Sequence, residues 1–164
     1  MAPNSPSRRT VLTVGGTVTA AILAGCNGID IGDEPDYEAG DVGDIDGEER
    51  TAEEMIAAES VAKQEITEGV TPLEGITIVD HEFVLEDGYL GSTVQGTVEN
   101  IGNDRIELVE VRVRVYDENG TQIDRYLDTT GDLSGGSEWE FQVVILEPPA
   151  DIADYDIVVL GTPA

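Results

Sequence analysis

The stretch from Ile106 to Tyr116 alternates apolar with charged residues at a period of two, and this pattern constrains the fold more than any other feature. Its apolar members are Val109, Val111, Val113 and Val115, and its charged members are Glu110, Arg112 and Arg114. Because successive side chains of a β-strand point to opposite faces, the alternation predicts a strand with one face in a core. Ile106 and Leu108 have the opposite parity, which predicts a β-bulge near Leu108.

Shorter runs of the same period lie on both sides of this strand and are separated by turn residues. They are Ile76 to Val79, Phe83 to Leu85, Val94 to Val98, Ile123 to Leu127, Trp139 to Ile145 and Tyr155 to Leu160. Roughly six to eight short strands with turns between them are typical of an antiparallel sandwich. We therefore expect residues 71–164 to form an all-β domain, an antiparallel β-sandwich of about seven strands.

The turn after the long strand fits two registers. A two-residue loop at Asn119-Gly120 would place Asp124 opposite Val115, whereas a three-residue loop with a left-handed glycine would place Ile123 there. We expect the second register, because it sets an apolar residue opposite the core-facing valine. Arg125 would then face inward, a known way to blunt an edge strand.

The first 26 residues are organised as an export signal. Arg8 and Arg9 precede an uncharged run from Val11 to Gly25 that is too short to span a bilayer. The paired arginines resemble the twin-arginine signal of proteins exported in the folded state. The Sec route stays open, because Thr10 to Thr13 lacks the Phe and Lys of the usual pattern. We expect residues 1–25 to be a signal peptide.

Leu23-Ala24-Gly25-Cys26 matches the lipobox of lipoproteins, in which cleavage before the cysteine leaves a thiol that receives lipid. Cys26 is the only cysteine of the chain, and the alternative is a small buried hydrophobe. Stable anchoring takes two acyl chains, which a lipoprotein's lipid supplies. We expect Cys26 to attach the protein to the extracytoplasmic face of the cell membrane, and no internal disulfide.

Acidic residues dominate the chain, with 35 Asp and Glu against 8 Lys and Arg and a formal charge of −27. This charge excludes nucleic acid as a partner. Self-repulsion on this scale destabilises a compact state unless salt screens it. The excess extends over both residues 27–70 and 71–164, so we interpret it as adaptation to high salt, in a halophilic archaeon, rather than as one acidic tail.

Residues 26–47 alternate glycine with acidic residues and show no period, so we expect a disordered, extended tether. Residues 48–70 predict one short amphipathic helix, with a capping box at Thr51-Ala52-Glu53-Glu54 and Gly69 just past its end. Its narrow apolar stripe either docks on the domain or belongs to a solvated helix. The stripe consists of Met55, Ala58, Ala62 and Ile66.

The C-terminal half also resembles the FxLYD-type domain of prokaryotic, especially haloarchaeal, lipoproteins and secreted proteins. The resemblance rests on Val94-Gln95-Gly96-Thr97-Val98-Glu99-Asn100, on Val109 to Gly120, and on Leu133-Ser134-Gly135-Gly136-Ser137 before Trp139-Glu140-Phe141. It implies an immunoglobulin-like sandwich over residues 71–164. It offers no catalytic residue to carry over to this chain.

The sequence holds no recognisable catalytic constellation, so we expect no enzyme, no cofactor and no metal site. His81 is the only histidine and shares the parity of Phe83 and Leu85, which favours a structural role over a ligand or a general base. Trp139 and Phe141 are expected in the core. Asp44 to Glu48 is too short a fragment of a calcium loop to predict a site.

Two features remain as candidate sites. All four basic residues after residue 71 lie on or beside one hairpin: Arg105, Arg112, Arg114 and Arg125. They form either a recognition face for an anionic glycan or acidic surface protein, or cross-strand pairs with Glu110 and Asp124. Asn119-Gly120-Thr121 is either a glycosylation sequon or only hairpin turn chemistry.

Together these features predict a lipid-anchored, extracytoplasmic β-sandwich module that acts as an interaction or structural domain at the cell surface. Its partners would be the membrane, through lipid on Cys26, and a surface protein or glycan. The alternative is an accessory lipoprotein that presents a substrate or solute to a membrane complex.

Overall fold

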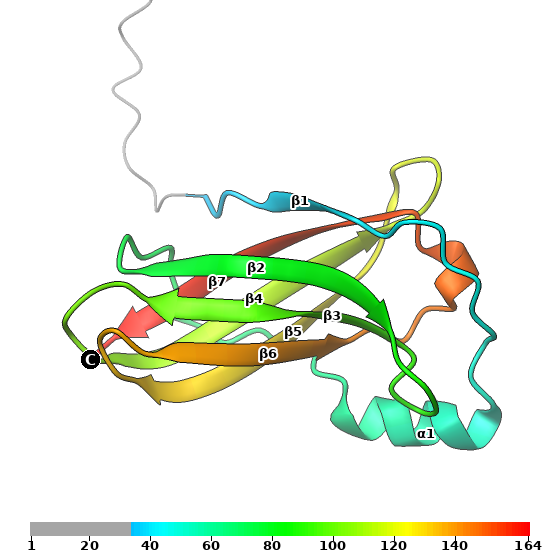
Figure 1. The fold of residues 1–164 in the computed structure, drawn as a ribbon, viewed down its shortest axis with the longest axis horizontal. Helices are drawn as coiled ribbons and strands as arrows, with labels where there is room; N and C mark the ends of the chain where they lie inside the picture. The colour runs from blue at the N-terminus through cyan, green and yellow to red at the C-terminus, as the bar shows by residue number, and fades with distance from the viewer. Residues whose placement is uncertain (1–33) are drawn as a thin grey trace, which may run out of the picture. The chain divides into compact units, whose positions relative to one another are not determined.

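In the computed structural model, which describes residues 34–164, strand β4 (Ile106–Tyr116) lies between β5 (Gln122–Leu133) and β7 (Asp154–Pro163). The short strand β1 (Glu38–Asp41) completes this sheet in the order β1-β7-β4-β5. A second sheet holds β2 (Ile76–Leu85), β3 (Ser92–Asn100) and β6 (Glu138–Val144) in the order β2-β3-β6. All neighbouring strands are antiparallel (Figure 1). Residues 34–164 therefore form a seven-stranded antiparallel β-sandwich, the class that the sequence predicts, with six of the strands within residues 71–164 and the seventh, β1, before them.

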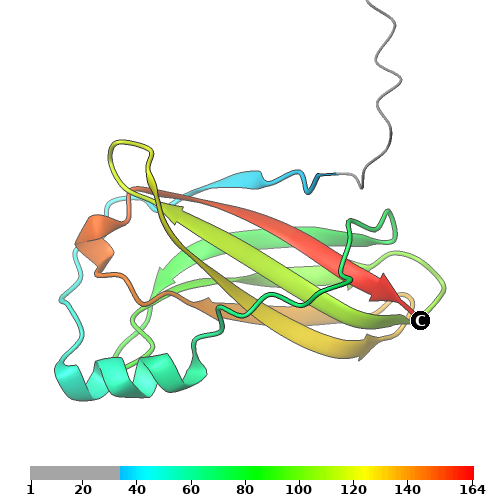
Figure 2. The ribbon, with the colours of Figure 1, turned by 180° about the vertical axis from the view of Figure 1, so that it is seen from behind.

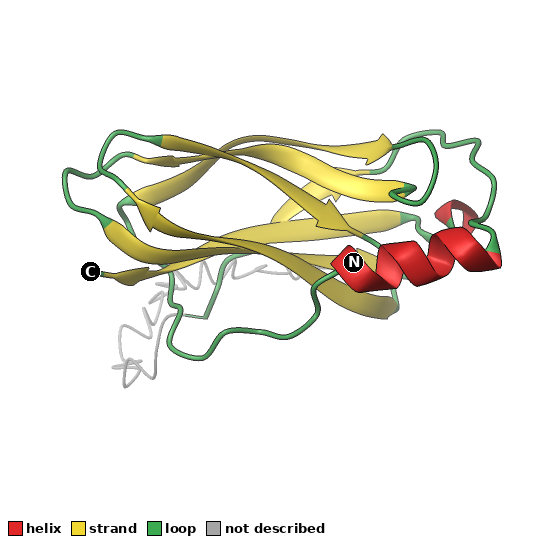
Figure 3. Cartoon of the chain, turned by 90° about the horizontal axis from the view of Figure 1, so that it is seen from below, coloured by secondary structure: helices red, strands yellow, loops and turns green. Residues whose placement is uncertain are grey.

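The two sheets pack face to face, with helix α1 (Ala52–Val61) at one end of the sandwich (Figure 3). A short 3-10 helix, η1 (Pro149–Asp151), precedes β7. The valines of the alternating run in β4 are fully buried and belong to one core with Val94, Val98, Phe141 and Val143 of the other sheet. The predicted bulge is confirmed, because the pairing of β4 with β7 shifts by one residue between Ile106 and Leu108.

The β4–β5 hairpin combines features of both predicted registers. Its loop has three residues, with Gly120 left-handed at φ +76°. A further register shift between Val115 and Tyr116 then brings Asp124, not Ile123, opposite Val115. The expected Ile123 pairing is therefore wrong.

The same shift decides which face the following residues of β5 occupy. Tyr126 lies opposite Val113 and is buried in the core, with 1% of its surface exposed. Arg125 consequently lies opposite Arg114, which faces away from the core. The expected inward-facing Arg125 is wrong, and burial of the Tyr126 ring accounts for the difference.

Part of the region predicted as a disordered tether is ordered. Residues 38–41 pair with residues 154–157 of β7, and Val42 is buried in the core. Gly40 lies against Tyr155 so closely that a Cβ there would stand 2.1 Å from the aromatic ring. The tether prediction for 26–47 is thus wrong for residues 38–42, where backbone pairing and close packing replace the missing apolar pattern. Its residues 26–33 lie outside the described part.

The segment between β1 and α1 is also fixed to the sandwich. The Arg50 guanidinium donates to the carbonyl oxygens of Tyr89 at 2.8 Å, Leu146 at 3.2 Å and Ile145 at 2.7 Å. Burial lowers the pKa of Arg50 from its ordinary value. The predicted boundary at residue 71 therefore separates no independent parts, and residues 34–164 form one unit.

Helix α1 begins as predicted but ends early. Thr51 and Glu54 form the capping box, since the Thr51 N–H donates to Glu54 Oε2 at 2.9 Å and the Glu54 N–H donates to Thr51 Oγ1 at 3.3 Å. The helix stops at Val61, so the predicted end near Gly69 is wrong. Extended backbone at Ala62 turns the chain toward β5, where the carbonyl of Lys63 accepts the Leu127 N–H at 2.9 Å.

Residues 62–71, here called the strap, cross the outer face of the four-stranded sheet (Figure 2). One end is bound at the edge of β5 through Lys63, and Thr71 pairs with Gly161 of β7 at the other end. The chain then turns into β2. The strap therefore covers part of a face that the alternation in β4 predicts to be exposed to solvent.

Candidate functional site on the outer face of the four-stranded sheet

Three of the four arginines predicted as a recognition face lie on the outer face of the four-stranded sheet, on adjacent strands. Arg112 and Arg114 come from β4, and Arg125 comes from β5 directly opposite Arg114. Arg105 lies apart, just before β4, where it pairs with the exposed carboxylate of Asp132. The structure thus brings together the three residues of the predicted interaction face.

Arg112 is already neutralised by a buried acid. Its Nε pairs with Oε1 of Glu110, whose side chain is fully buried beneath the strap. Glu110 Oε2 accepts the backbone N–H of Thr67 at 2.9 Å, and Arg112 also reaches the Thr67 carbonyl at 3.5 Å. The pair holds the strap on the sheet, so Arg112 is not available to a partner.

Arg114 is neutralised by an acid on the neighbouring strand. Its Nε and one terminal nitrogen donate to the two carboxylate oxygens of Asp156 at 2.8 and 2.5 Å. The Tyr116 hydroxyl donates to the same carboxylate at 2.9 Å. The Tyr37 ring lies under the guanidinium, with its centroid 3.6 Å from Cζ, a cation–π contact. Hydrogen bonding to Asp156 raises the pKa of Arg114.

Arg125 differs from the other five basic residues within 34–164. Its guanidinium enters no ion pair or hydrogen bond in that part of the chain, and its Nε is buried without a partner. A buried donor without a partner costs about 1–3 kcal/mol, and like charges on opposite strand positions repel. Arg112 is therefore paired with Glu110 on its own strand and Arg114 with Asp156 on the neighbouring strand, while Arg125 retains an uncompensated charge.

The opposite outer face has a different character. The three-stranded sheet bears a shallow hollow of about 640 Å³. Its charged lining residues are acidic: Asp80, Glu82 and Glu140, with Gln95, Thr97 and Gln142 between them. A hollow of this chemistry suits a cationic or neutral polar group, and no residue pattern in the sequence located it.

His81 takes part in a contact between the two sheets. Its Nδ1 lies 2.7 Å from the hydroxyl of Tyr155, and the rings meet edge to face at 5.6 Å. Burial, with the nearby charges of Glu82 and Asp41, raises the pKa of Tyr155 to about 12. The pair joins β2 to β7, which agrees with the structural role predicted for His81; its partner was not predicted.

The remaining predicted site residues are separated from this surface. Asn119 lies exposed at the tip of the β4–β5 hairpin. Arg8, Arg9 and Cys26 fall outside the described residues. Within residues 34–164 there is no group of three or more His, Cys, Asp or Glu side chains placed to hold a metal ion. No helix of that part is long and apolar enough to cross a membrane.

The chain is similar in part to an archaeal protein and to one solved structure. No family model matches the chain. An uncharacterized protein of Methanocaldococcus jannaschii is 35% identical over 86 residues, which are 51% of this chain and 63% of that protein. The crystal structure of a DUF1425 family member from Shewanella sp. pv-4 superposes with a TM-score of 0.40 and 13% identity, covering 58% of this chain and 92% of that chain. The resemblance to FxLYD-type domains stays a prediction.

Proposed function

We propose that the protein is a lipid-anchored module at the extracytoplasmic face of the cell membrane, and that it acts by binding rather than by catalysis. The observation that carries this proposal is Leu23-Ala24-Gly25-Cys26, placed directly after a paired-arginine, uncharged segment. Small residues before a lone cysteine are the chemistry that lipoprotein processing needs. The resemblance to FxLYD-type domains of haloarchaeal lipoproteins supports the same assignment, and so does the acidity expected of a protein in concentrated salt.

The surface that binds is the uncovered part of the outer face around Arg125. Arginine and tyrosine are enriched among residues that dominate binding energy at protein interfaces. Arg114 lies directly opposite Arg125, and the rings of Tyr37 and Tyr116 lie near the Arg114 guanidinium. Its free guanidinium suits a carboxylate. We infer that the partner is an acidic protein or glycan at the cell surface.

A second function is favoured by the hollow on the three-stranded sheet. An accessory lipoprotein that presents a solute to a membrane complex needs a concave surface, and the acidic hollow would hold a cationic solute. In that case the double variant Glu82→Gln with Glu140→Gln would lose binding of the cationic solute, whereas Arg125→Gln would retain it. The opposite pattern supports the interaction module.

The anchoring proposal is tested by Cys26→Ser in the full chain. The variant should leave the membrane fraction, because the atom that bears lipid is lost while residues 34–164 are unchanged. Gly28→Ala is the control, since it lies beyond the lipobox and should remain in the membrane fraction. Membrane attachment of Cys26→Ser that resists alkaline washing would contradict the proposal.

The export route is tested separately. Replacing Arg8 and Arg9 together by lysine keeps the charge but removes the paired arginines. On the twin-arginine route the precursor should stay in the cytoplasm, whereas normal export of the double variant would indicate the Sec route.

A further inference from the structure

The tip of the β4–β5 hairpin stands clear of the rest of residues 34–164. Residues 118–121 are exposed, and a Cβ added at Gly120 would meet no atom within 4 Å. The tip holds Asn119-Gly120-Thr121, which is the only N-glycosylation sequon of the chain. Such a sequon consists of Asn, any residue except proline, and then Ser or Thr. The structure separates the two explanations that the sequence leaves open for Asn119.

The turn is built by Asp117 and Gly120. The Asp117 N–H donates to the Thr121 carbonyl at 2.9 Å, and the Gly120 N–H donates to the Asp117 carbonyl at 3.0 Å. One carboxylate oxygen of Asp117 accepts the N–H of Asn119 at 2.9 Å and that of Thr121 at 2.8 Å. None of these four bonds uses the side-chain amide of Asn119.

Asn119 does not supply the unusual backbone angle either. Asn-Gly is favoured in a two-residue hairpin turn because both of its central residues then have positive φ. Here the loop has three residues, and the positive φ belongs to Gly120. Within residues 34–164 the non-glycine residue with positive φ is Asp132, not Asn119. Turn chemistry therefore explains Asp117 and Gly120, and the part of Asn119 in the turn is limited to its backbone N–H and a contact of its side chain with the Asp117 carboxylate.

We propose that Asn119 is the acceptor of an N-linked glycan. This inference rests on the proposed extracytoplasmic location, where a transferase can reach the tip of the folded protein. The donor is a sugar carried as a phosphate ester on a lipid. The amide nitrogen of Asn119 forms a bond to the anomeric carbon, the bond from that carbon to the phosphate oxygen breaks, and the lipid phosphate leaves with the bonding electrons. The amide gives up one proton to a base of the transferase, and no group is oxidised or reduced.

A glycan at this position would not disturb the fold, because the hydrogen bonds of the turn remain. It would add a hydrophilic mass at the hairpin tip. Arg114 and Arg125 form the third residue pair from the loop, so a glycan at the tip would border this part of the outer face.

The test is the intact mass of the full chain, purified from the cells that naturally make it. The wild-type mass should exceed that of lipid and peptide by a whole number of sugar residues. Asn119→Gln and Thr121→Ala should both remove this excess, and Thr121→Ser should keep it. Asn103→Gln is the matched control, because Asn103 is also exposed in a turn but has Arg105 two residues later; this variant should keep the excess.

Protease treatment of intact cells separates this proposal from the location on which it rests. A protein that is digested from outside yet has the mass of lipid and peptide alone overturns the modification and leaves the location standing. A protein that is shielded from the protease and unmodified overturns both. An excess mass that survives Asn119→Gln also overturns the assignment to this residue.

Discussion

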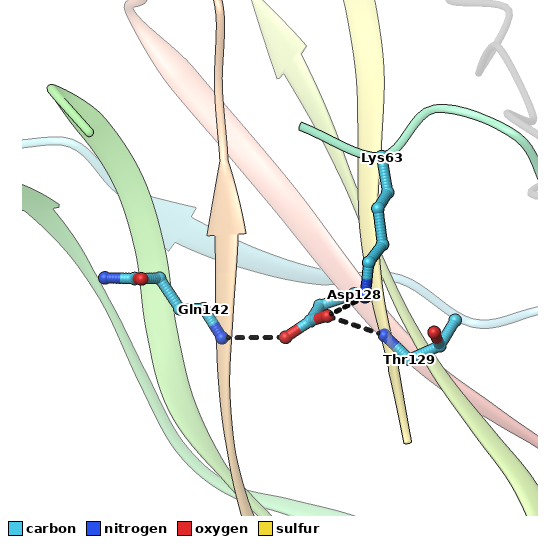
Figure 4. Close-up of polar contacts among 4 residues, drawn as sticks. All are labelled: Lys63, Asp128, Thr129 and Gln142. Carbon is cyan, nitrogen blue, oxygen red and sulfur yellow. Dashed lines mark hydrogen bonds and ion pairs between the residues drawn. The ribbon is translucent and has the colours of Figure 1, made fainter. Parts of the chain in front are cut away.

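Asp128 on β5 accepts a hydrogen bond from the backbone N–H of Gln142 on β6 at 3.2 Å, which links an edge strand of one sheet to an edge strand of the other (Figure 4). The same carboxylate accepts the Thr129 N–H at 2.8 Å and pairs with Lys63 of the strap at 2.8 Å. One side chain therefore satisfies an edge amide that would otherwise be unpaired, and holds the strap at β5.

Asp128→Ala should lower the free energy of unfolding by about 1–3 kcal/mol, because two backbone N–H groups lose their acceptor. Denaturant unfolding at constant molar salt measures the change. Arg105→Gln is the control, since the pair of Arg105 with Asp132 is exposed and worth about 1 kcal/mol at most. Equal effects of the two variants would contradict the role assigned to Asp128.

Glu110→Ala should lower the free energy of unfolding by about 3–5 kcal/mol, because it leaves the mostly buried side chain of Arg112 without its counter-ion. Amide hydrogen exchange should show lost protection of Thr67, whose N–H donates to Glu110. Glu107→Ala, on the same strand but exposed, should change little. Replacing Glu110 and Arg112 together by leucine should recover much of the loss; if the double variant is worse than the single one, the pair is not the cause.

Gly40→Ala should release β1 from the sheet, because the added Cβ would overlap the Tyr155 ring. The expected cost of such overpacking is about 1–3 kcal/mol. Hydrogen exchange of residues 38–41 is the measurement. Gly75→Ala should have little effect, since a Cβ there meets no atom within 4 Å. Unchanged protection of β1 in Gly40→Ala would show that this strand does not pack as described.

Raising the pH should destabilise the fold through Tyr155. Its folded-state pKa of about 12 exceeds the ordinary value of 10.0, so the unfolded chain loses its proton first. The stability that neutral Tyr155 contributes is complete below about pH 10 and is lost between about pH 10 and pH 12. Thermal unfolding against pH should show this fall. Tyr155→Phe should reduce it, and Tyr89→Phe, at an exposed position, should not.

Much of the fold could be predicted from the sequence, because these features follow from local patterns of residues. The β4 valines, the bulge near Leu108 and the capping box at Thr51 and Glu54 all depend on residues a few positions apart. The predicted register of the β4–β5 hairpin was wrong because a register shift between Val115 and Tyr116 follows the three-residue loop. This shift brings Asp124 opposite Val115 in place of Ile123. Only burial of Tyr126 in the folded core decides between the registers, and that depends on the opposite sheet.

The features that the sequence did not predict depend on contacts between segments that are far apart in the chain. Glu110 alternates with buried valines like any solvent-facing residue, and its burial comes from the strap, which contacts it through Thr67. Strand β1 has no apolar pattern, and its order comes from pairing with β7 and from the fit of Gly40 on Tyr155. The arginines of the outer face were predicted as a set. The sequence could not show that Arg114 is paired and Arg125 is not, because the partner of Arg114 is Asp156 on another strand.

The position of β1 limits how high the protein can stand above a bilayer. This strand begins at Glu38, twelve residues after Cys26. Twelve residues span at most about 43 Å when fully extended, similar to the roughly 40–45 Å thickness of a bilayer with its headgroups. With lipid on Cys26, the sandwich would be confined to a thin layer next to the membrane. A partner would have to enter that layer, so large soluble assemblies would meet it less readily than proteins and glycans that are themselves held at the same surface.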